Sequence, residues 1–344
     1  MCLQFPAPEG YASRVRDGIS LVGYDAFCTP PVVGVAMPGP YTANAFTLAP
    51  VSPQADAISQ LFVGTLIFLG AILALVTFLV IFAVIRYRDR PGAPEAQQKF
   101  GSRKLELLWT VVPILSLVVL AGFMVRTMAV CDPPTADAKP DLRIVAHQWW
   151  WEIYYLKTGV VTANEIHIPV GKRLLVDFRS ADVIHDFWAP DLGRKIDIVP
   201  GHPNRLWIEA DRVGTYLGVC AEFCGNEHAW MRFLVIADPP ERFAAWMKEQ
   251  GAAPPKPVTA DEQLGAKIYR ERICTNCHMR SVGPDLTHIA SRRTLAAGAL
   301  ENTPANLAAW LHDPDDFKPG SNMPNFKLSD EEVHALVAYL ETQK

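Results

Sequence analysis

The sequence has no basic excess. Its 344 residues include 32 Lys or Arg and 36 Asp or Glu, which gives a formal net charge of −4. A nucleic-acid-binding protein needs a basic surface, so the composition excludes that class of function. The charges are also evenly spread, since residues 139–250 hold 13 basic against 15 acidic side chains and residues 259–344 hold 9 against 12. Neither stretch is a strongly charged docking face.

Charge is missing altogether from residues 57–85, and this run is longer than the roughly 20 residues that span a bilayer as a helix. A second uncharged run covers residues 107–125, and its Pro113 is tolerable where neighbouring helices satisfy the freed carbonyl. Such runs predict a transmembrane helical hairpin over residues 57–128. Six cations lie between the two runs and place the loop in the cytoplasm and both ends of the chain outside: Arg86, Arg88, Arg90, Lys99, Arg103 and Lys104.

Residues 1–56 lack a clean hydrophobic periodicity and are rich in Pro, Gly and Ala. They also lack the basic end and unbroken apolar core of a clear secretory signal. We therefore predict an irregular extracytoplasmic tail here. Three of the seven cysteines, Cys2, Cys28 and Cys131, belong to no motif.

Soft metal ligands are concentrated in residues 220–231, which contain two cysteines, a histidine and a methionine. Thiolate, imidazole and thioether together favour copper over magnesium or calcium, and the methionine argues against structural zinc. Cys224, His228 and Met231 with one upstream histidine would suit a mononuclear blue-copper site. The second thiolate, Cys220, allows two bridged copper ions instead. The alternative is a short-loop disulfide, which would leave the spacing of His228 and Met231 unexplained.

This loop, together with the segment His185-Asp186-Phe187-Trp188-Ala189-Pro190, resembles the binuclear copper centre of cytochrome c oxidase subunit II. The resemblance implies bridging thiolates at Cys220 and Cys224 and terminal imidazoles at His185 and His228. It also implies two weaker copper ligands, the thioether of Met231 and the backbone carbonyl of Glu222.

The resemblance gives Glu222 a second role, because in that family its side chain reaches a magnesium or manganese ion shared with the catalytic subunit. A hard carboxylate suits such an ion. The alternative is that Glu222 is a solvated loop acid.

Short β-type runs separated by turn residues begin at Leu142 and predict an antiparallel sandwich. The resemblance extends over residues 57–238 and implies a cupredoxin-like, all-β Greek-key sandwich over residues 139–238, which we call the copper domain. The predicted strands cover residues 142–155, 164–170, 173–180, 195–199, 204–210, 214–220 and 232–237.

Three tryptophans stand in a row at Trp149, Trp150 and Trp151. Successive side chains of a strand alternate between its two faces, so at least one of the three should face away from the core. The resemblance implies that this run lies over the copper centre and that Trp149 accepts electrons from cytochrome c. The alternative, three core tryptophans, disagrees with the alternation.

The second apolar run opens with Glu106-Leu107-Leu108-Trp109, which also resembles oxidase subunit II. In that family the acid lies at the entrance of a proton path into the catalytic subunit. A carboxylate at the cytoplasmic membrane boundary, beside buried protein, can collect protons. The alternative is that Glu106 only stabilises the start of its helix through the helix dipole.

Residues 239–258 are predicted to be a linker, because a short helical stretch is followed by Gly251-Ala252-Ala253-Pro254-Pro255. Beyond the linker, Cys274-Thr275-Asn276-Cys277-His278 is the attachment motif of c-type haem, in which His278 binds the iron. A thioredoxin-like dithiol would need a βαβ unit, and a zinc knuckle would need a second ligand pair.

Residues 259–344, which we call the haem domain, are predicted to be an all-α class I cytochrome c domain. Capping boxes at Thr259 and Ser329 predict a helix before the haem motif and another near the C-terminus. Gly265 and Tyr339 stand where the first and last helices of such domains cross. Met323 is the expected sixth iron ligand, with His288 or His312 as alternatives; both histidines are otherwise expected at the surface.

These predictions describe a multidomain membrane protein that passes electrons from a donor through haem c and a copper pair to a haem–copper catalytic subunit. There, oxygen would be reduced to water with proton translocation. The expected partners are oxidase subunits I and III, and the donor is cytochrome c or a cytochrome bc complex. The expected location is the inner membrane, crossed twice, with both termini and the metal domains on the periplasmic side. The alternatives are the copper subunit of a nitric oxide reductase and a membrane-tethered electron carrier.

Overall fold

The computed structural model describes residues 49–92, 100–132, 137–272, 274–279 and 282–344. Nearly all of the predicted tail, residues 1–56, therefore lies outside the described residues. Every described residue belongs to one compact unit, 37–344.

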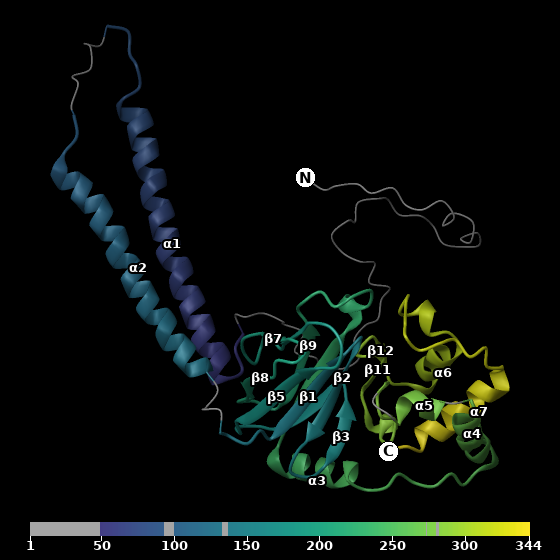
Figure 1. Ribbon diagram of the computed structural model, residues 1–344. Coiled ribbons are helices and arrows are strands. Elements are labelled where there is room, and N and C mark those ends of the chain that lie inside the picture. The colour runs from purple at the N-terminus through teal and green to yellow at the C-terminus, as the bar shows by residue number, and fades with distance from the viewer. Residues whose placement is uncertain (1–48, 93–99, 133–136, 273, 280–281) are drawn as a thin grey trace. The chain divides into compact units, whose positions relative to one another are not determined.

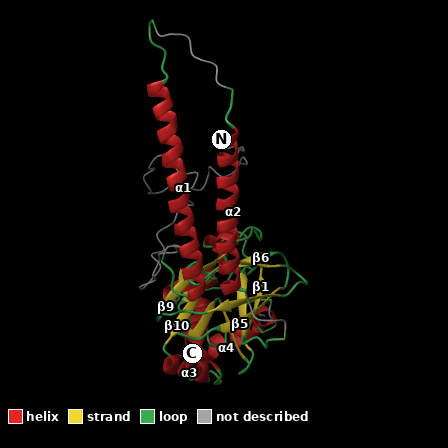
Figure 2. Ribbon diagram, turned by 90° about the vertical axis from the view of Figure 1, so that its left-hand side faces the viewer, coloured by secondary structure: helices red, strands yellow, loops and turns green. Residues whose placement is uncertain are grey.

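Two long helices, α1 (Pro53–Arg86) and α2 (Arg103–Cys131), run side by side (Figures 1 and 2). Both are long and apolar enough to cross a membrane. Most of their large apolar side chains are exposed on the surface of the protein. Ser52 caps α1, because its hydroxyl accepts a hydrogen bond from the N–H of Ala55. The same hydroxyl donates to the carbonyl of Leu192 at 2.7 Å, which ties the start of α1 to the copper domain.

The copper domain is a sandwich of two five-stranded sheets. The first has the order β3 (Val160–Ala163), β2 (Trp150–Tyr155), β1 (Leu142–His147), β5 (Leu174–Ser180) and β8 (Asn204–Ile208). The second has the order β4 (Glu165–Pro169), β10 (Arg232–Asp238), β9 (Gly214–Cys220), β6 (His185–Trp188) and β7 (Ile196–Ile198). Fully buried aromatic rings fill the core, and Phe187 stacks on Phe233 with 4.2 Å between ring centroids.

Two features of this sandwich correct the sequence prediction. The sheets are mixed, because β1 pairs with β5 in parallel and β4 pairs with β10 in parallel. The predicted strand 142–155 is two strands, since the chain turns back at Gln148 and Trp149 and pairs His147 with Trp150. The short strands β3 and β6 were not predicted as strands. Hydrophobic alternation indicates that a segment is a strand, but it does not specify which strand lies beside it.

Helix α3 (Pro240–Gln250) follows the sandwich and packs Trp246 on its surface, where the indole stacks on His167 at 4.0 Å. The ring of His167 also contacts Asp238 at 2.7 Å, so this histidine has a structural role.

The haem domain contains four α-helices and a two-stranded ribbon among its described residues. Both predicted capping boxes are present, at Thr259 and at Ser329. A Cβ atom on Gly265 would lie 1.9 Å from the carbonyl oxygen of Ala335, so only glycine permits this close crossing of the first and last helices. The elements are α4 (Ala260–Glu271), α5 (Cys274–His278), β11 (Thr294–Leu295), β12 (Leu300–Glu301), α6 (Pro304–His312) and α7 (Asp330–Glu341).

Candidate metal centre and haem pocket

Three neighbouring strands position the predicted copper ligands. The loop from Cys220 to Met231 connects β9 to β10, and its two ends are joined by a hydrogen bond from the N–H of Cys220 to the carbonyl of Met231. The adjacent strand β6 begins at His185 and pairs Phe187 with Cys220. Because these strands belong to one sheet, the histidine and the loop come together on a rigid support.

The side chains of the predicted ligands converge. The two thiol sulfurs, Cys220 Sγ and Cys224 Sγ, lie 3.7 Å apart, and the ligand atoms of His185, Cys220 and Cys224 all lie within 4.8 Å of one another. A disulfide needs about 2.05 Å between its sulfurs, so both thiols are free.

The remaining predicted ligands surround the same two sulfurs. His185 Nδ1 lies 4.0 Å from Cys220 Sγ, and His228 Nδ1 lies 3.6 Å from Cys224 Sγ. The thioether sulfur of the buried Met231 lies 3.8 Å from Cys224 Sγ, and the backbone oxygen of Glu222 lies 3.2 Å from Cys220 Sγ. Two thiols, two imidazoles and a thioether in one cluster, in which only His228 is partly exposed, fit copper.

The protonation of the two thiols is strongly coupled. The hydrogen bond between the two thiols lowers the pKa of the Cys220 thiol far below its ordinary value, with a smaller contribution from His185. The same contact raises the pKa of Cys224. A metal that binds both sulfurs requires both thiols to lose their protons.

Asp182 orients His185 and was not predicted from the sequence. Its Oδ1 lies 2.8 Å from His185 Nε2, which leaves Nδ1 directed at Cys220. Burial disfavours the charged imidazole, but hydrogen bonds with Asp182 and Cys220 outweigh burial and raise the pKa of His185. A carboxylate behind a metal-binding imidazole is a common way to fix its tautomer. Only its proximity in sequence to His185 could have suggested this role.

Trp149 lies in the turn between β1 and β2 and is partly buried beside the loop. Its indole nitrogen donates to the backbone carbonyl of Cys224 at 2.9 Å. Trp150 and Trp151 are 6% and 0% exposed, so two of the three indoles are buried. Trp149 differs from them because it lies in the turn, and not because side chains alternate along a strand.

The two acidic residues predicted to face the catalytic subunit are both exposed. Glu222 lies in the copper loop with its side chain directed outward. Glu106 lies in the first turn of α2. An exposed position is compatible with the predicted roles and with the alternatives.

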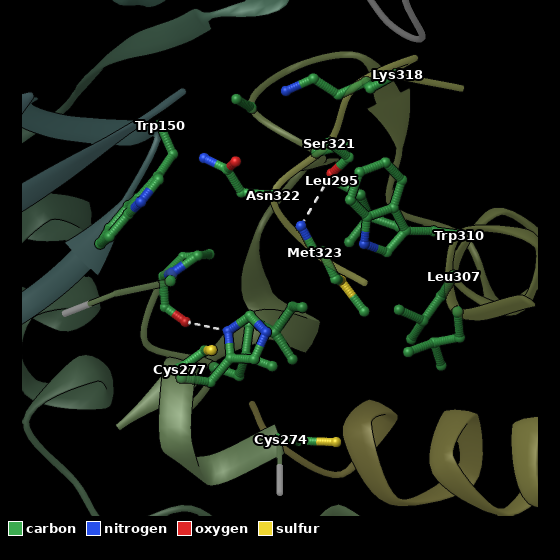
Figure 3. Close-up of a pocket in the computed structure, with 18 of the residues that line it drawn as sticks. Trp150, Cys274, Cys277, Leu295, Leu307, Trp310, Lys318, Ser321, Asn322 and Met323 are labelled. Carbon is green, nitrogen blue, oxygen red and sulfur yellow. Dashed lines mark hydrogen bonds between the residues drawn. The ribbon is translucent and has the colours of Figure 1, made fainter. Parts of the chain in front are cut away.

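The haem motif forms one wall of a pocket in the haem domain. Cys274, Cys277 and Met323 all line it (Figure 3). His278 also lines the pocket, and its Nδ1 donates to the carbonyl of Pro284 at 2.8 Å, which leaves Nε2 free to bind iron. Burial lowers the pKa of His278 and so favours the neutral imidazole that a metal requires.

The rest of the pocket is mainly apolar and fits a porphyrin. Its lining includes Leu286, Ile289, Leu307, Leu336 and Leu340. Met323 lines the pocket, whereas His288 and His312 do not. The expectation that His288 lies at the surface is wrong, because it is 4% exposed and its Nδ1 lies 2.7 Å from the backbone oxygen of Lys344.

The fold and these two sites define a membrane-bound electron-transfer protein with a copper domain and a c-type haem domain. The chain belongs to the cytochrome c oxidase subunit II family and carries a C-terminal cytochrome c domain. It matches the families "Cytochrome C oxidase subunit II, transmembrane domain" over residues 41–126 and "Cytochrome C oxidase subunit II, periplasmic domain" over residues 156–237. Residues 262–344 match the family "Cytochrome c".

Curated relatives are similar in sequence to this chain along most of its length. Cytochrome c oxidase subunit 2 of Alkalihalophilus pseudofirmus is 36% identical over 314 residues, which cover 88% of this chain and 91% of the relative. The protein of the same name from Bacillus sp. strain PS3 is 33% identical and covers 75% and 80%. A crystal structure of the periplasmic domain of subunit II from Bradyrhizobium japonicum is 31% identical, with a TM-score of 0.31, and covers 33% of this chain and 94% of that chain.

Membership of this family makes the chain an oxidoreductase subunit of a terminal oxidase. It implies copper, haem c, a two-pass membrane topology and other oxidase subunits as partners. These conclusions confirm the predicted fold class of a transmembrane hairpin, a cupredoxin-like sandwich and a cytochrome c domain.

Proposed function

We propose that this chain receives electrons from an external donor at haem c and passes them through a copper pair to a haem–copper catalytic subunit. That subunit reduces oxygen to water with proton translocation. The observation that carries the proposal is the cluster of two free thiols, two imidazoles and a thioether around one point between β6, β9 and β10.

The copper pair would be held by bridging thiolates from Cys220 and Cys224 and by imidazoles from His185 and His228. The thioether of Met231 and the backbone carbonyl of Glu222 would be the weaker ligands. Two copper ions held by both thiolates would share one unpaired electron and would take up and release an electron with little rearrangement. The strands keep the ligands rigid, since β9 and β10 hydrogen-bond along their whole length.

Haem c would be attached through thioether bonds to Cys274 and Cys277, with His278 and Met323 as the axial ligands. The hydrogen bond from His278 to Pro284 fixes the imidazole, and the apolar lining would keep water away from the iron. Trp149 is the proposed point at which electrons reach the copper loop, because its indole hydrogen-bonds to Cys224.

The proposed assembly includes oxidase subunits I and III. The exposed Glu222 would supply a ligand to a magnesium ion shared with the catalytic subunit, and Glu106 would mark the entrance of a proton path at the cytoplasmic boundary. In the proposed assembly, the metal domains and both termini would lie on the periplasmic side of the inner membrane. The donor would be a cytochrome c or a cytochrome bc complex.

Two alternatives are the copper subunit of a nitric oxide reductase and a tethered carrier without an oxidase partner. Glu106 and Glu222 weigh against the tethered carrier, because each has a proposed role only beside a catalytic subunit. The curated relatives named cytochrome c oxidase subunit 2 favour an oxidase over a nitric oxide reductase.

Purification of the complex tests the proposal. We expect two copper ions and one covalently bound haem for each copy of this chain, and oxygen consumption by the complex. One copper ion, haem that is lost on acid extraction, or consumption of nitric oxide instead of oxygen would contradict it.

A further inference from the structure

Two contacts join the segment before Met323 to the copper domain, one to the copper loop and one to the turn beside it. The buried Lys318 Nζ lies 2.8 Å from Glu227 Oε2, and the two side chains are only 4% and 3% exposed. Four residues further on, the side-chain amide of Asn322 donates to the backbone carbonyl of Gln148 at 3.0 Å. Glu227 belongs to the copper loop, and Gln148 lies in the turn beside it.

Gln148 continues this connection to a predicted copper ligand. Its side-chain amide donates to the backbone carbonyl of Cys224 at 2.7 Å, and the indole of Trp149 donates to the same oxygen. Gly225 makes this possible, because a Cβ atom there would lie 2.9 Å from the indole and 3.0 Å from Gln148 Nε2. Its φ of +117° is also one that other residues rarely adopt.

The haem pocket is lined from the copper domain as well as from the haem domain. Gln148, Trp149 and Trp150 contribute to the same lining as Cys277 and Met323, and Figure 3 shows Trp150 beside the pocket with Asn322 and Met323. The haem would therefore face the copper domain and not open solvent on this side.

We infer that Asn322 and Gln148 form an electron path from haem c to the copper pair, which enters the copper loop at the same carbonyl of Cys224 that Trp149 contacts. We also infer that the ion pair of Lys318 with Glu227 holds this path in register. The path runs from Met323 along the backbone to Asn322, across one hydrogen bond to Gln148, and across a second to Cys224. One electron leaves the reduced haem and is accepted by the oxidised copper pair, and no covalent bond forms or breaks. This inference rests on the proposed function and adds a specific route to it.

A continuous path matters because electron transfer weakens steeply across gaps between atoms. Two short hydrogen bonds and the covalent bonds of Met323, Asn322, Gln148 and Cys224 replace a jump through space. Both charged groups of the ion pair are buried, so the removal of one would leave the other as an unpaired buried charge. The pair therefore differs from a solvent-exposed ion pair, which contributes little.

The path is tested by Asn322→Leu in the purified complex, with Asn325→Leu as the matched control. Asn325 lies in the same loop, and its side chain contacts only the nearby N–H of Lys327 among the hydrogen bonds described. An electron is injected photochemically into haem c, and its arrival at copper is followed by absorbance.

We expect Asn322→Leu to slow this step severalfold, because the substitution replaces the hydrogen bond to Gln148 with a gap that the electron must cross through space. The haem potential and the electron paramagnetic resonance spectrum of copper should stay unchanged, and Asn325→Leu should transfer at the wild-type rate. Wild-type kinetics in Asn322→Leu would overturn the path. Absence of haem-to-copper transfer in the wild type would instead refute the proposed function.

The positioning role of Lys318 is tested without reference to activity. Pulsed electron paramagnetic resonance measures the distance between the haem iron and the copper pair, and we expect one narrow distribution in the wild type. The double variant Glu227→Gln/Lys318→Met removes both charges, so no unpaired charge is left buried. A broadened distribution in the double variant supports the role of the ion pair, and an unchanged one contradicts it.

Discussion

The carboxylate of Glu165 accepts hydrogen bonds from both the backbone N–H and the hydroxyl of Thr294, at 2.9 and 3.1 Å, across 129 residues of sequence. The same oxygen accepts a third hydrogen bond, from the N–H of Arg293 at 2.7 Å. Glu165 begins β4 of the copper domain, whereas Thr294 begins β11 of the haem domain. One buried side chain therefore satisfies several polar groups of the other domain and fixes how the two domains meet.

Replacement of Glu165 by Ala should loosen this contact. The buried N–H of Thr294 would lose its partner, which costs about 1–3 kcal/mol for such a group, and the partly buried N–H of Arg293 would lose the same partner. We expect faster hydrogen exchange at residues 293 and 294 and a lower unfolding temperature. Glu249→Ala is the control, because its ion pair with Arg242 is exposed and long, at 3.8 Å. Equal exchange in the two variants would contradict a docking role for Glu165.

Met231→Leu should retain copper and shift its reduction potential. The two side chains have similar volumes, so this buried position should tolerate the change at a cost below about 1.5 kcal/mol. An axial thioether binds copper weakly, and its loss changes the potential more than the affinity. Metal analysis and a redox titration of the purified complex measure both effects. Loss of copper from Met231→Leu, or a potential equal to that of the wild type, would disagree with a weak axial role.

Glu106→Gln should slow steady-state turnover while reduction of haem c and copper stays normal. Only proton delivery to the catalytic subunit would be affected, because the substitution leaves both metal sites intact. Oxygen consumption is measured over a range of pH and compared with the rate of haem c reduction after mixing with a reductant. Unchanged oxygen consumption at every pH would remove Glu106 from the proton path.

Asp191 should make the copper domain less stable as the pH rises. It is buried, and burial raises the pKa of its carboxyl to about 6. Since the unfolded chain has an ordinary pKa of about 3.9, the stabilising protonation is complete below that value and is lost as the pH rises through about 6.

The variant Asp191→Asn keeps the neutral form at every pH. Its unfolding temperature should exceed that of the wild type above pH 6, and the difference should disappear below about pH 4. Thermal unfolding of the two proteins, followed through the copper absorbance, measures the difference. A constant offset between them across this range would contradict titration of Asp191.

Local sequence signals predicted much of the site. The spacing of Cys220, Cys224, His228 and Met231 reflects one tight loop between two paired strands, and the haem motif is a short helix, α5. Capping boxes and apolar runs likewise depend on residues a few positions apart. Such features are visible in sequence because the interacting groups are close along the chain.

Contacts between distant segments were not predictable in the same way. The parallel pairings of β1 with β5 and of β4 with β10 depend on how the chain crosses between sheets. The burial of Trp150 against Ala163 and Ala297 depends on the docking of the haem domain. Asp182 carries no motif of its own, and its role emerges only when the ring of His185 is in place.

The central claim is that electrons pass through haem c and then copper before they reach the catalytic subunit. The most direct test is anaerobic mixing of the oxidised complex with a reductant, while absorbance follows haem c, copper and the haem of the catalytic subunit. The account predicts reduction in that order. In Cys220→Ser, haem c should be reduced at the wild-type rate while the haem of the catalytic subunit stays oxidised. Reduction of that haem at the wild-type rate in Cys220→Ser would show that electrons bypass the copper loop and would contradict the account.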